Sequence, residues 1–255
     1  MNAPYTPASG LFAGLNRRWA RVAARKPLQL PSDRAIITIT FDDFPKSAAS
    51  TGAAILERHG WQGTYYASAG YAGGQTHHGA MFDCGDLQRL VGAGHEIACH
   101  TYSHLDASQV GTGAFLADIA RNERALKAMG LETELESFAF PYGEASPATK
   151  RALSERFSNL RGVQADINRG AADRNLLKSV PIDGGDAGID RAVEAAVSLS
   201  RHTGWLIFYA HDVQDAPTEW GCTPAQLERV CQAIADSGAD VLTMREAVRQ
   251  MEASA

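Results

Sequence analysis

The 255-residue sequence predicts an α/β fold, organised as one barrel-like domain of about seven βα units. Three observations support this prediction. Short β-branched or apolar runs alternate with amphipathic segments from Asp33 onward, as in folds built on a parallel sheet. Neither a linker nor an internal repeat divides this part of the chain, and α/β barrels of this length commonly form one domain. A doubly wound open sheet is the alternative, but no Gly-x-Gly-x-x-Gly element follows the first strand, which weakens a nucleotide-binding interpretation.

The first half of the domain predicts three strands, each followed by a helix. Residues 36–40 are Ile or Thr throughout, as expected of a strand buried on both faces. Gly60 and Gly130 end the helices that precede them. In order, the elements are strand 36–40, helix 46–59, strand 63–68, a loop rich in Gly and His at 69–82, helix 85–94, strand 95–99 and helix 112–129.

The second half continues the alternation. Residues 205–209 are bulky and apolar and form the clearest buried strand of the chain. Ser146 and Thr223 each stand before a proline, which is the pattern of an N-cap followed by the first helical residue. In order, the elements are strand 137–140, a helix from 147, strands near 160–164 and 176–182, helix 189–202, strand 205–209, helix 224–237, strand 241–242 and a closing helix.

Residues 1–34 are predicted to form a partly helical extension in front of a domain that spans residues 35–255. Two sets of residues are separated on such a helix, the apolar Leu11, Leu15, Trp19 and Val22 and, opposite them, the arginines Arg17, Arg18, Arg21 and Arg25. A helix of this kind can pack on the domain or seek a membrane surface. We take packing on the domain as the expectation.

The composition argues against several classes of function. With 45% hydrophobic and 21% charged residues, it is that of an ordinary globular protein. The net charge of −5 argues against nucleic acid or an anionic membrane as the main partner, because basic patches hold both. The longest apolar runs, such as residues 205–210, are too short to span a bilayer, so we expect no transmembrane segment. The sequence predicts no particular oligomeric state.

No secretory signal is visible in residues 1–35, because basic residues interrupt the stretch where its apolar core would lie. We therefore expect a cytoplasmic protein. In a chain without an export signal, cysteines are expected to be reduced and mostly buried. The chain has four, at Cys84, Cys99, Cys222 and Cys231.

Polar residues collect just after the predicted strand ends. In parallel α/β folds this edge of the sheet carries the active site. One polar residue there would mean little, but four strands each deliver at least one. These residues are Asp42 and Asp43, His100 and His104, Tyr142, and His211 and Asp212.

His100 and His104 are candidate metal ligands. Two imidazoles four residues apart can face one point, but catalytic zinc usually takes three protein ligands. Adjacent carboxylates leaving a strand point in different directions, so one of Asp42 and Asp43 can bind a metal while the other faces its bound water. Two His and one Asp suit Zn²⁺ or a similar divalent ion. His211 can be a core residue, or a general acid if it faces the same site.

Four segments together resemble the polysaccharide deacetylases, the NodB-homology group also called carbohydrate esterase family 4. The resemblance runs from about Ile36 to Met244 and includes the order and spacing of the segments. They are Thr40-Phe41-Asp42-Asp43, His100-Thr101-Tyr102-Ser103-His104 after Gly94-His95-Glu96-Ile97, Phe140-Pro141-Tyr142-Gly143, and Leu206-Ile207-Phe208-Tyr209-Ala210-His211.

The resemblance implies a distorted (β/α) barrel and a metal-dependent N-deacetylase. Asp43, His100 and His104 would hold one divalent metal ion, zinc in first place, with cobalt, nickel or manganese as alternatives. The implied substrate is an N-acetylated amino sugar in an oligosaccharide, a polysaccharide or a lipid-linked glycan. Two alternatives stay open: hydrolysis of an N-formyl sugar or a small cyclic amide, and a metal-containing glycan-binding protein without turnover.

The same resemblance assigns roles to the remaining motif residues. Asp42 would be the general base and His211 the general acid that protonates the departing amine. Pro141 and Tyr142 would lie in a substrate-binding loop, in which a backbone N–H helps to hold the oxyanion.

The sequence departs from the family pattern at two points. The arginine that many members carry shortly before the Pro-Tyr-Gly loop is missing, since residues 138–140 are Phe-Ala-Phe. The Asp-Trp motif, whose Asp supports the catalytic His, is not evident between Leu160 and Asp183. Arg161, Asp166 and Asp173 remain open as substitutes.

Substrate contacts are the least determined part of the sequence. Five loop residues are candidates, although each is expected to be ordinary loop surface: Tyr71, His77, His78, Asp83 and Trp220. Of these, Trp220 could stack on a sugar ring.

Overall fold

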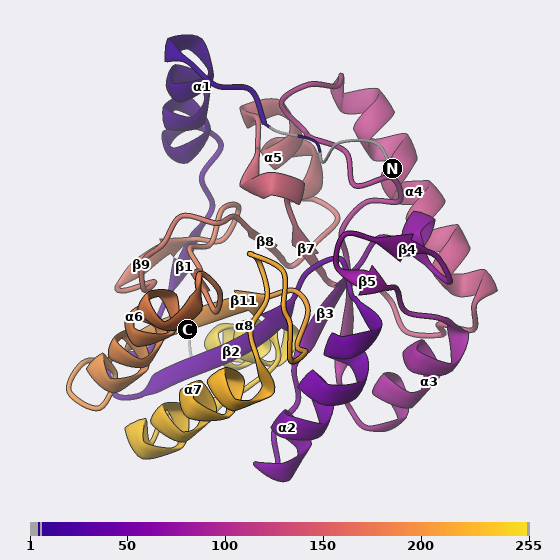
Figure 1. Ribbon diagram of the computed structural model, residues 1–255. Coiled ribbons are helices and arrows are strands. Elements are labelled where there is room, and N and C mark those ends of the chain that lie inside the picture. The colour runs from indigo at the N-terminus through magenta and orange to yellow at the C-terminus, as the bar shows by residue number, and fades with distance from the viewer. Residues whose placement is uncertain (1–4, 6, 254–255) are drawn as a thin grey trace.

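The computed structural model describes residue 5 and residues 7–253. It shows a curled parallel sheet with helices packed around it (Figure 1). The strands are β1 (Pro27–Gln29), β2 (Ala35–Phe41), β3 (Thr64–Ala67), β4 (Gln75–Thr76), β5 (Gly79–Ala80), β6 (Glu96–Cys99), β7 (Ser137–Ala139), β8 (Asn159–Arg161), β9 (Ala171–Asp173), β10 (Val180–Pro181), β11 (Gly204–Ala210) and β12 (Asp240–Val241). The α-helices are α1 (Leu11–Val22), α2 (Ala53–Arg58), α3 (Cys84–Gly92), α4 (Thr112–Ala128), α5 (Pro147–Leu153), α6 (Gly185–Ser198), α7 (Pro224–Ser237) and α8 (Met244–Ala253).

The strand order confirms the predicted barrel class. The main sheet runs β10-β11-β2-β3-β6-β7-β8, and β12 pairs with the first half of β2. Read as a ring from β2, the strands follow chain order, whereas a doubly wound sheet would reverse its order at a switch point. The ring is open between β8 and β10. Backbone hydrogen bonds between residues 160–164 and residues 177–179 partly bridge this opening, so the fold is a distorted barrel.

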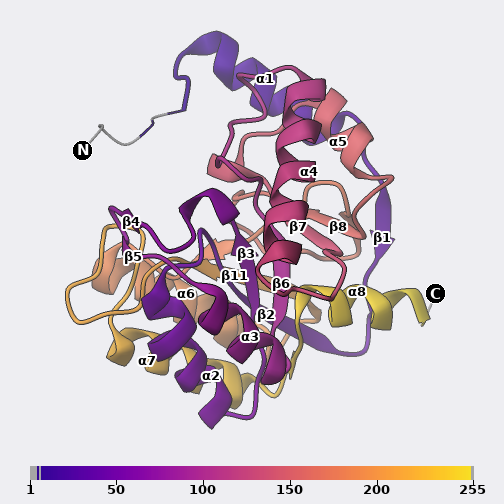
Figure 2. The ribbon, with the colours of Figure 1, turned by 90° about the vertical axis from the view of Figure 1, so that its right-hand side faces the viewer.

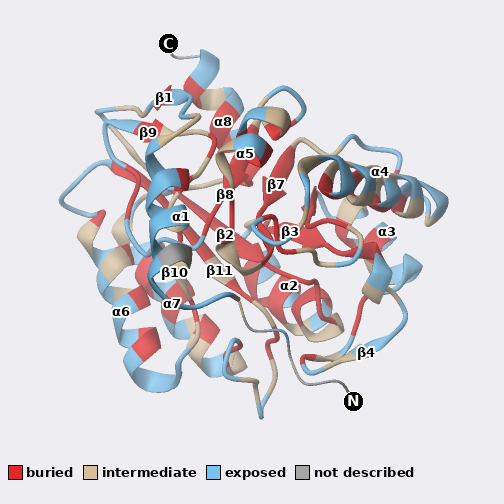
Figure 3. Ribbon diagram, turned by 90° about the horizontal axis from the view of Figure 1, so that it is seen from above, coloured by how far each residue is buried: buried red, intermediate tan, exposed pale blue. Residues whose placement is uncertain are grey.

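Alternate residues of β2 face two different cores. Ile37, Ile39 and Phe41 pack outward with α2, α3, α6 and α7, while Ile36 faces the interior of the curled sheet. Both sides are buried, as the unbroken β-branched run predicts, and Figure 3 shows buried strands surrounded by helices with exposed outer sides. Thr40 satisfies its hydroxyl by donating to the Phe208 carbonyl at 2.8 Å.

Helix α8 closes the amino-terminal end of the sheet. Met244, Val248 and Met251 pack inside the curled sheet. The Met244 N–H donates to the hydroxyl of Thr64, the first residue of β3, and the Arg245 N–H donates to Glu96, the first residue of β6. The carboxyl ends of the strands are therefore left as the edge available for a site.

Most predicted elements are present, with four differences. Helix α6 starts at Gly185, four residues before the prediction, and the strand predicted at 176–182 shortens to β10. The helix predicted at 46–59 contains a π-helical turn, Ala48–Gly52, before α2. Two antiparallel pairs, β1 with β9 and β4 with β5, are not predicted from the sequence. These strands have two or three residues each, too few to show an alternating pattern.

The expectation that α1 packs its apolar face on the domain is wrong. Leu11 and the three apolar residues that share its side of the helix are exposed. Contact with the domain is made instead through Ala20, which is buried, and through Arg17, whose Nε lies 2.5 Å from Glu144. The fully buried Lys150 ammonium also donates to the carbonyls of Ala20 and Ala23, at 2.8 and 2.9 Å.

Three of the four cysteines are buried and Cys84 is exposed; all four are free thiols. In the part of the chain that the structure describes, no helix has the length and apolar content needed to cross a bilayer.

Candidate metal centre and active site

The parallel sheet brings the predicted site residues to one edge. Asp42 and Asp43 follow β2, His100 follows β6, and His211 follows β11. Ala210 is in register with Phe41, and the Asp42 N–H donates to the Ala210 carbonyl at 2.9 Å. The edge is therefore fixed by the central strands of the sheet, which hold these residues more firmly than a loop would.

Five non-glycine residues at this edge have left-handed backbone conformations. They are Asp43, Phe44, Thr101, His104 and Tyr142, with φ between 52° and 65°. Such conformations cost of order 1–3 kcal/mol each and persist only where the surroundings impose them. Strain of this kind clusters at functional sites, and here the strained segments carry two of the predicted metal ligands.

Asp43, His100 and His104 form a compact ligand cluster. His104 Nε2 lies 3.2 Å and His100 Nε2 3.8 Å from Asp43 Oδ1. His100 Nδ1 lies 2.8 Å from the Ala139 carbonyl, which can only accept, so Nδ1 carries the hydrogen and Nε2 presents a lone pair. Asp43 Oδ1 is buried and receives no hydrogen bond from any described residue. Of the two adjacent aspartates, Asp43 is thus the candidate for the third ligand beside His100 and His104.

The protonation states of this cluster suit a cation. Burial raises the pKa of Asp43, but the opposing effect of His104 and His100 is larger and brings this pKa down to about 2. Burial lowers the pKa of His104 to about 4, against the opposing effect of Asp43. The carboxylate is therefore ionised and the imidazole of His104 neutral at neutral pH, the forms in which both bind metals. A buried carboxylate oxygen with no donor, facing imidazole lone pairs, fits a divalent ion.

A second pair of histidines lies on the other side of Asp43. His78 Nε2 is 3.6 Å from Asp43 Oδ2, and one ring nitrogen each of His78 and His211 lies within 4.8 Å of a carboxylate oxygen of Asp43 and of each other. The rings of His78 and His211 are stacked, 4.7 Å between centroids. His78 Nδ1 contacts Asp212 Oδ1 at 3.1 Å, and Asp212 also accepts from Thr218 and Gln214.

His78 is the main site residue that differs from its prediction. The sequence predicts ordinary loop surface, but the side chain is buried because the β4–β5 hairpin folds it toward the sheet edge. Tyr71 is half-buried, with its ring 6.0 Å from that of His104. His77 is exposed, with its ring tilted against that of His78, whereas Asp83 caps α3 and pairs with Lys46.

Asp42 is paired with Arg161 at the end of β8. Arg161 Nη2 lies 2.5 Å from Asp42 Oδ1 and also contacts Oδ2, and both side chains are almost fully buried. Burial raises the pKa of Asp42, but Arg161, with His100 and His211, lowers it below its ordinary value. Of the residues left open as substitutes, Arg161 therefore takes the place of the missing arginine beside Asp42. Asp166 pairs with Lys178 and Asp173 with Lys150, away from this cluster.

His211 is oriented by a backbone group. Its Nδ1 lies 3.2 Å from the Trp220 carbonyl, so a carbonyl stands where the family pattern would place an aspartate. Burial, followed by the effect of His78, lowers the pKa of His211 to about 4. The imidazole is therefore neutral in the resting site at neutral pH. Trp220 itself is 45% exposed, and its indole offers a flat apolar surface.

Pro141 and Tyr142 lie at the opposite rim. Pro141 is buried, and the Tyr142 ring stands edge-on to His104 with 4.4 Å between centroids. Tyr5 covers Tyr142 from outside at 4.7 Å, and its hydroxyl donates to Asp106 at 2.7 Å. His100, His104 and His211 therefore gather around Asp43, and Tyr142 contacts this cluster through His104.

Two comparisons relate the sequence to known proteins. The polysaccharide deacetylase family model matches residues 30–156. A probable peptidoglycan-N-acetylglucosamine deacetylase from Arthroderma benhamiae is 23% identical over 135 residues, which cover 53% of this chain and 29% of the relative. The chain thus spans less than a third of the length of that relative.

Solved structures share the fold over most of both chains. The chitin deacetylase of Colletotrichum lindemuthianum has a TM-score of 0.64 at 14% identity, covering 86% of this chain and 89% of the other. A family 4 carbohydrate esterase from Streptomyces lividans has a TM-score of 0.56 at 21% identity, covering 83% and 93%. A CE4 family pseudoenzyme from Bacillus anthracis has a TM-score of 0.61 at 14% identity, covering 86% and 66%. At such identities the likeness establishes the fold, and the site must establish the chemistry.

Proposed function

Because the chain belongs to the polysaccharide deacetylase family, we propose that it is a metal-dependent hydrolase that removes N-acetyl groups from an amino sugar. The substrate would be an oligosaccharide, a polysaccharide or a lipid-linked glycan. One observation carries the proposal: a buried Asp–His–His cluster lies beside a second aspartate that a buried arginine keeps ionised. In this arrangement Asp43, His100 and His104 would hold the metal, and the separate carboxylate of Asp42 would remove a proton.

Asp43, His100 and His104 are proposed to hold one divalent ion, most suitably zinc, with cobalt, nickel or manganese as alternatives. A bound ion would supply Lewis-acid polarisation of the amide carbonyl and of the attacking water. The two histidines would contribute their Nε2 atoms, and Asp43 its unpartnered oxygen.

Asp42 is proposed to act as the general base. Its carboxylate removes a proton as water adds to the carbonyl carbon, and Arg161 holds that carboxylate in one orientation. The low pKa of Asp42 keeps the base ionised down to acidic pH. The backbone N–H in the Pro141-Tyr142 loop is proposed to donate to the oxyanion that forms.

His211 is proposed to protonate the amine as the C–N bond breaks and acetate leaves. Since its pKa is low, the imidazole is neutral at rest. It would receive the proton that Asp42 removes from the attacking water and pass it to the amine nitrogen as the C–N bond breaks. The Trp220 carbonyl fixes Nδ1, which directs the other ring nitrogen toward the substrate. We further propose that the exposed Trp220 indole stacks on a sugar ring.

The experiment that tests this proposal is a measurement of acid release from matched substrates. N-acetylglucosamine oligomers, their N-formyl analogues and small cyclic amides are offered to the metal-loaded protein. Acetate release from the oligomers, abolished by a chelator and restored by added metal, is the expected result. Faster turnover of formyl or cyclic substrates would favour the first alternative.

A glycan-binding protein without turnover remains the second candidate, because the fold also includes a pseudoenzyme. Binding of the same oligomers without release of any acid would support it. The intact Asp42–Arg161 pair favours the enzyme, since a binding protein has no need of a buried, oriented base. The cytoplasmic location expected from the sequence stays a prediction.

A further inference from the structure

Helix α1 carries an apolar face that nothing in the described structure covers. The exposed fractions are 88% for Leu11, 60% for Leu15, 62% for Trp19 and 62% for Val22. At about 100° per residue these four side chains fall within an arc of about 80°. Figures 1 and 2 show α1 at the outer edge of the molecule, beyond α5. A contiguous apolar strip of this kind marks an interaction surface.

The contacts on the other side of α1 hold this face outward. Ala20 lies about 180° from Leu11 around the helix and is buried against the domain. The fully buried Lys150 ammonium binds the carbonyls of Ala20 and Ala23, and Arg17 pairs with the buried Glu144. Turning α1 to hide its apolar residues would break these interactions and leave Lys150 short of two acceptors. The contacts of α1 with the domain therefore keep its apolar face exposed.

The charge around α1 is opposite in sign to that of the whole chain. Although the net charge is −5, the first 32 residues contain five basic residues and no acidic one. Arg18, Arg21 and Arg25 are exposed, and none of them has an ion-pair partner among the described residues. The chain thus concentrates positive charge beside its apolar helix face, as helices that lie in an anionic membrane surface do.

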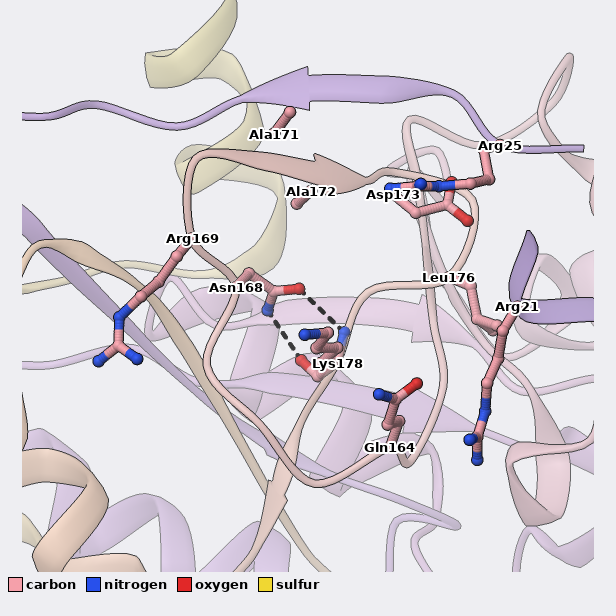
Figure 4. A pocket seen from close by; sticks show the side chains of 10 residues that line it. All are labelled: Arg21, Arg25, Gln164, Asn168, Arg169, Ala171, Ala172, Asp173, Leu176 and Lys178. Carbon is pink, nitrogen blue, oxygen red and sulfur yellow. Dashed lines mark hydrogen bonds between the residues drawn. The ribbon is translucent and has the colours of Figure 1, made fainter. Parts of the chain in front are cut away.

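A basic pocket of about 140 Å³ adjoins the same helix (Figure 4). Its charged lining consists of Arg21, Arg25, Arg169, Lys178 and Asp173. The carboxylate of Asp173 is engaged by Lys150, and the Asn168 amide, joined to the Lys178 backbone by two hydrogen bonds, fixes the loop. Arg169 has no ion-pair partner among the described residues. Lys178 pairs with Asp166 at 2.6 Å, so Arg21, Arg25 and Arg169 are the cations that the pocket offers to an anion.

We propose that α1 docks the protein on an anionic membrane surface. Leu11, Leu15, Trp19 and Val22 enter the boundary between head groups and acyl chains, and the basic pocket binds the phosphate of an anionic lipid. The inference goes beyond the proposed deacetylation and does not depend on it. The net charge of −5 does not oppose docking, because the local charge decides within a Debye length of about 10 Å.

The test is co-sedimentation of the full chain with vesicles of phosphatidylcholine alone or mixed with phosphatidylglycerol. We expect binding to the mixed vesicles, weakening with salt, with a blue shift of Trp19 fluorescence. The double variant Leu15→Ser, Trp19→Ser should bind at least about tenfold more weakly and lose the shift. The double variant Arg21→Ala, Arg25→Ala should bind about fivefold more weakly per arginine removed.

The matched control is Val197→Ser, Arg201→Ala, which removes an exposed apolar and an exposed basic residue from the region of α6. It should bind like the wild type.

Equal binding by all variants, or no binding to the mixed vesicles, would refute the proposal. Concentration-dependent dimerisation lost in Leu15→Ser, Trp19→Ser, without vesicle binding, would overturn it in favour of a second copy of the chain. Free phosphate should not compete at millimolar concentration, and effective competition would contradict a lipid site. Hydrolysis of soluble oligomers should be unchanged in every variant, which separates this test from that of the deacetylase.

Discussion

The Asp42→Asn variant should lose hydrolysis by about 10²–10⁴-fold while it keeps its bound metal. Asparagine has nearly the shape of aspartate but cannot accept the proton of the attacking water. The proposed metal ligands Asp43, His100 and His104 are untouched, so metal content should equal that of the wild type. The rate of hydrolysis is measured with a saturating glycan, and the metal content is measured on the same sample.

The control for this variant is Asp236→Asn, on the exposed side of α7. It removes the same charge far from the sheet edge and should leave both quantities unchanged. If Asp42→Asn keeps its turnover, Asp42 is not the base. If it loses the metal as well, Asp42 is a ligand and the separation of roles between the two aspartates is wrong.

The Arg161→Met variant should be the most destabilising single change at the site. Methionine fills similar space but leaves the Asp42 carboxylate buried without its partner, which costs about 3–5 kcal/mol of unfolding free energy. The remaining activity should also change its pH dependence. In the wild type, Asp42 is ionised to below the ordinary aspartate pKa of about 3.9, so activity holds at acidic pH. In the variant, burial raises this pKa unopposed by Arg161, and the acid limb of kcat/KM should move to higher pH.

Denaturation in urea and a pH profile of kcat/KM measure these effects. Arg151→Met, on the exposed side of α5, is the control and should alter neither. The double variant Asp42→Asn, Arg161→Met should recover part of the lost stability, because no charge is then left unpaired. An acid limb that stays in place in Arg161→Met would contradict the assignment of Arg161 as the residue that holds Asp42 ionised.

The sequence could predict that the candidate metal ligands lie together, because residues far apart in the chain follow strands of one parallel sheet. Asp43 and His100 are far apart in the chain, but both follow strands of one parallel sheet, and the carboxyl ends of such strands meet. His104 needed only a spacing of four residues from His100. Reading strand ends therefore located the site without knowledge of any contact.

The partners of these residues could not be identified in the same way. Arg161 belongs to a three-residue strand, and its pairing with Asp42 depends on how far the sheet curls, which strand order does not set. His78 reaches the site through a hairpin of two two-residue strands, which leave no periodic signal. The family pattern predicts an aspartate at His211 Nδ1, whereas the structure places the Trp220 backbone carbonyl there. Any residue type can supply such a carbonyl, so the residue types carry no signal for it.

The exposed face of α1 shows a different limit. Its amphipathic pattern was evident, but the same pattern serves packing on a domain and docking on a membrane. The buried Lys150, which binds the carbonyl groups near the end of α1, decides between the two orientations. This interaction joins residues about 130 positions apart, and local periodicity holds no trace of it.

The central claim, a catalytic metal held by Asp43, His100 and His104, is tested most directly by metal analysis of the purified protein and of His100→Ala. We expect about one equivalent of a divalent ion per chain. A chelator should remove this ion and abolish acetate release, and added metal should restore both. His100→Ala should hold only a trace, at a fold stability close to that of the chelated wild type. A wild type without divalent metal that still releases acetate, or a His100→Ala variant with full metal content, would contradict the claim.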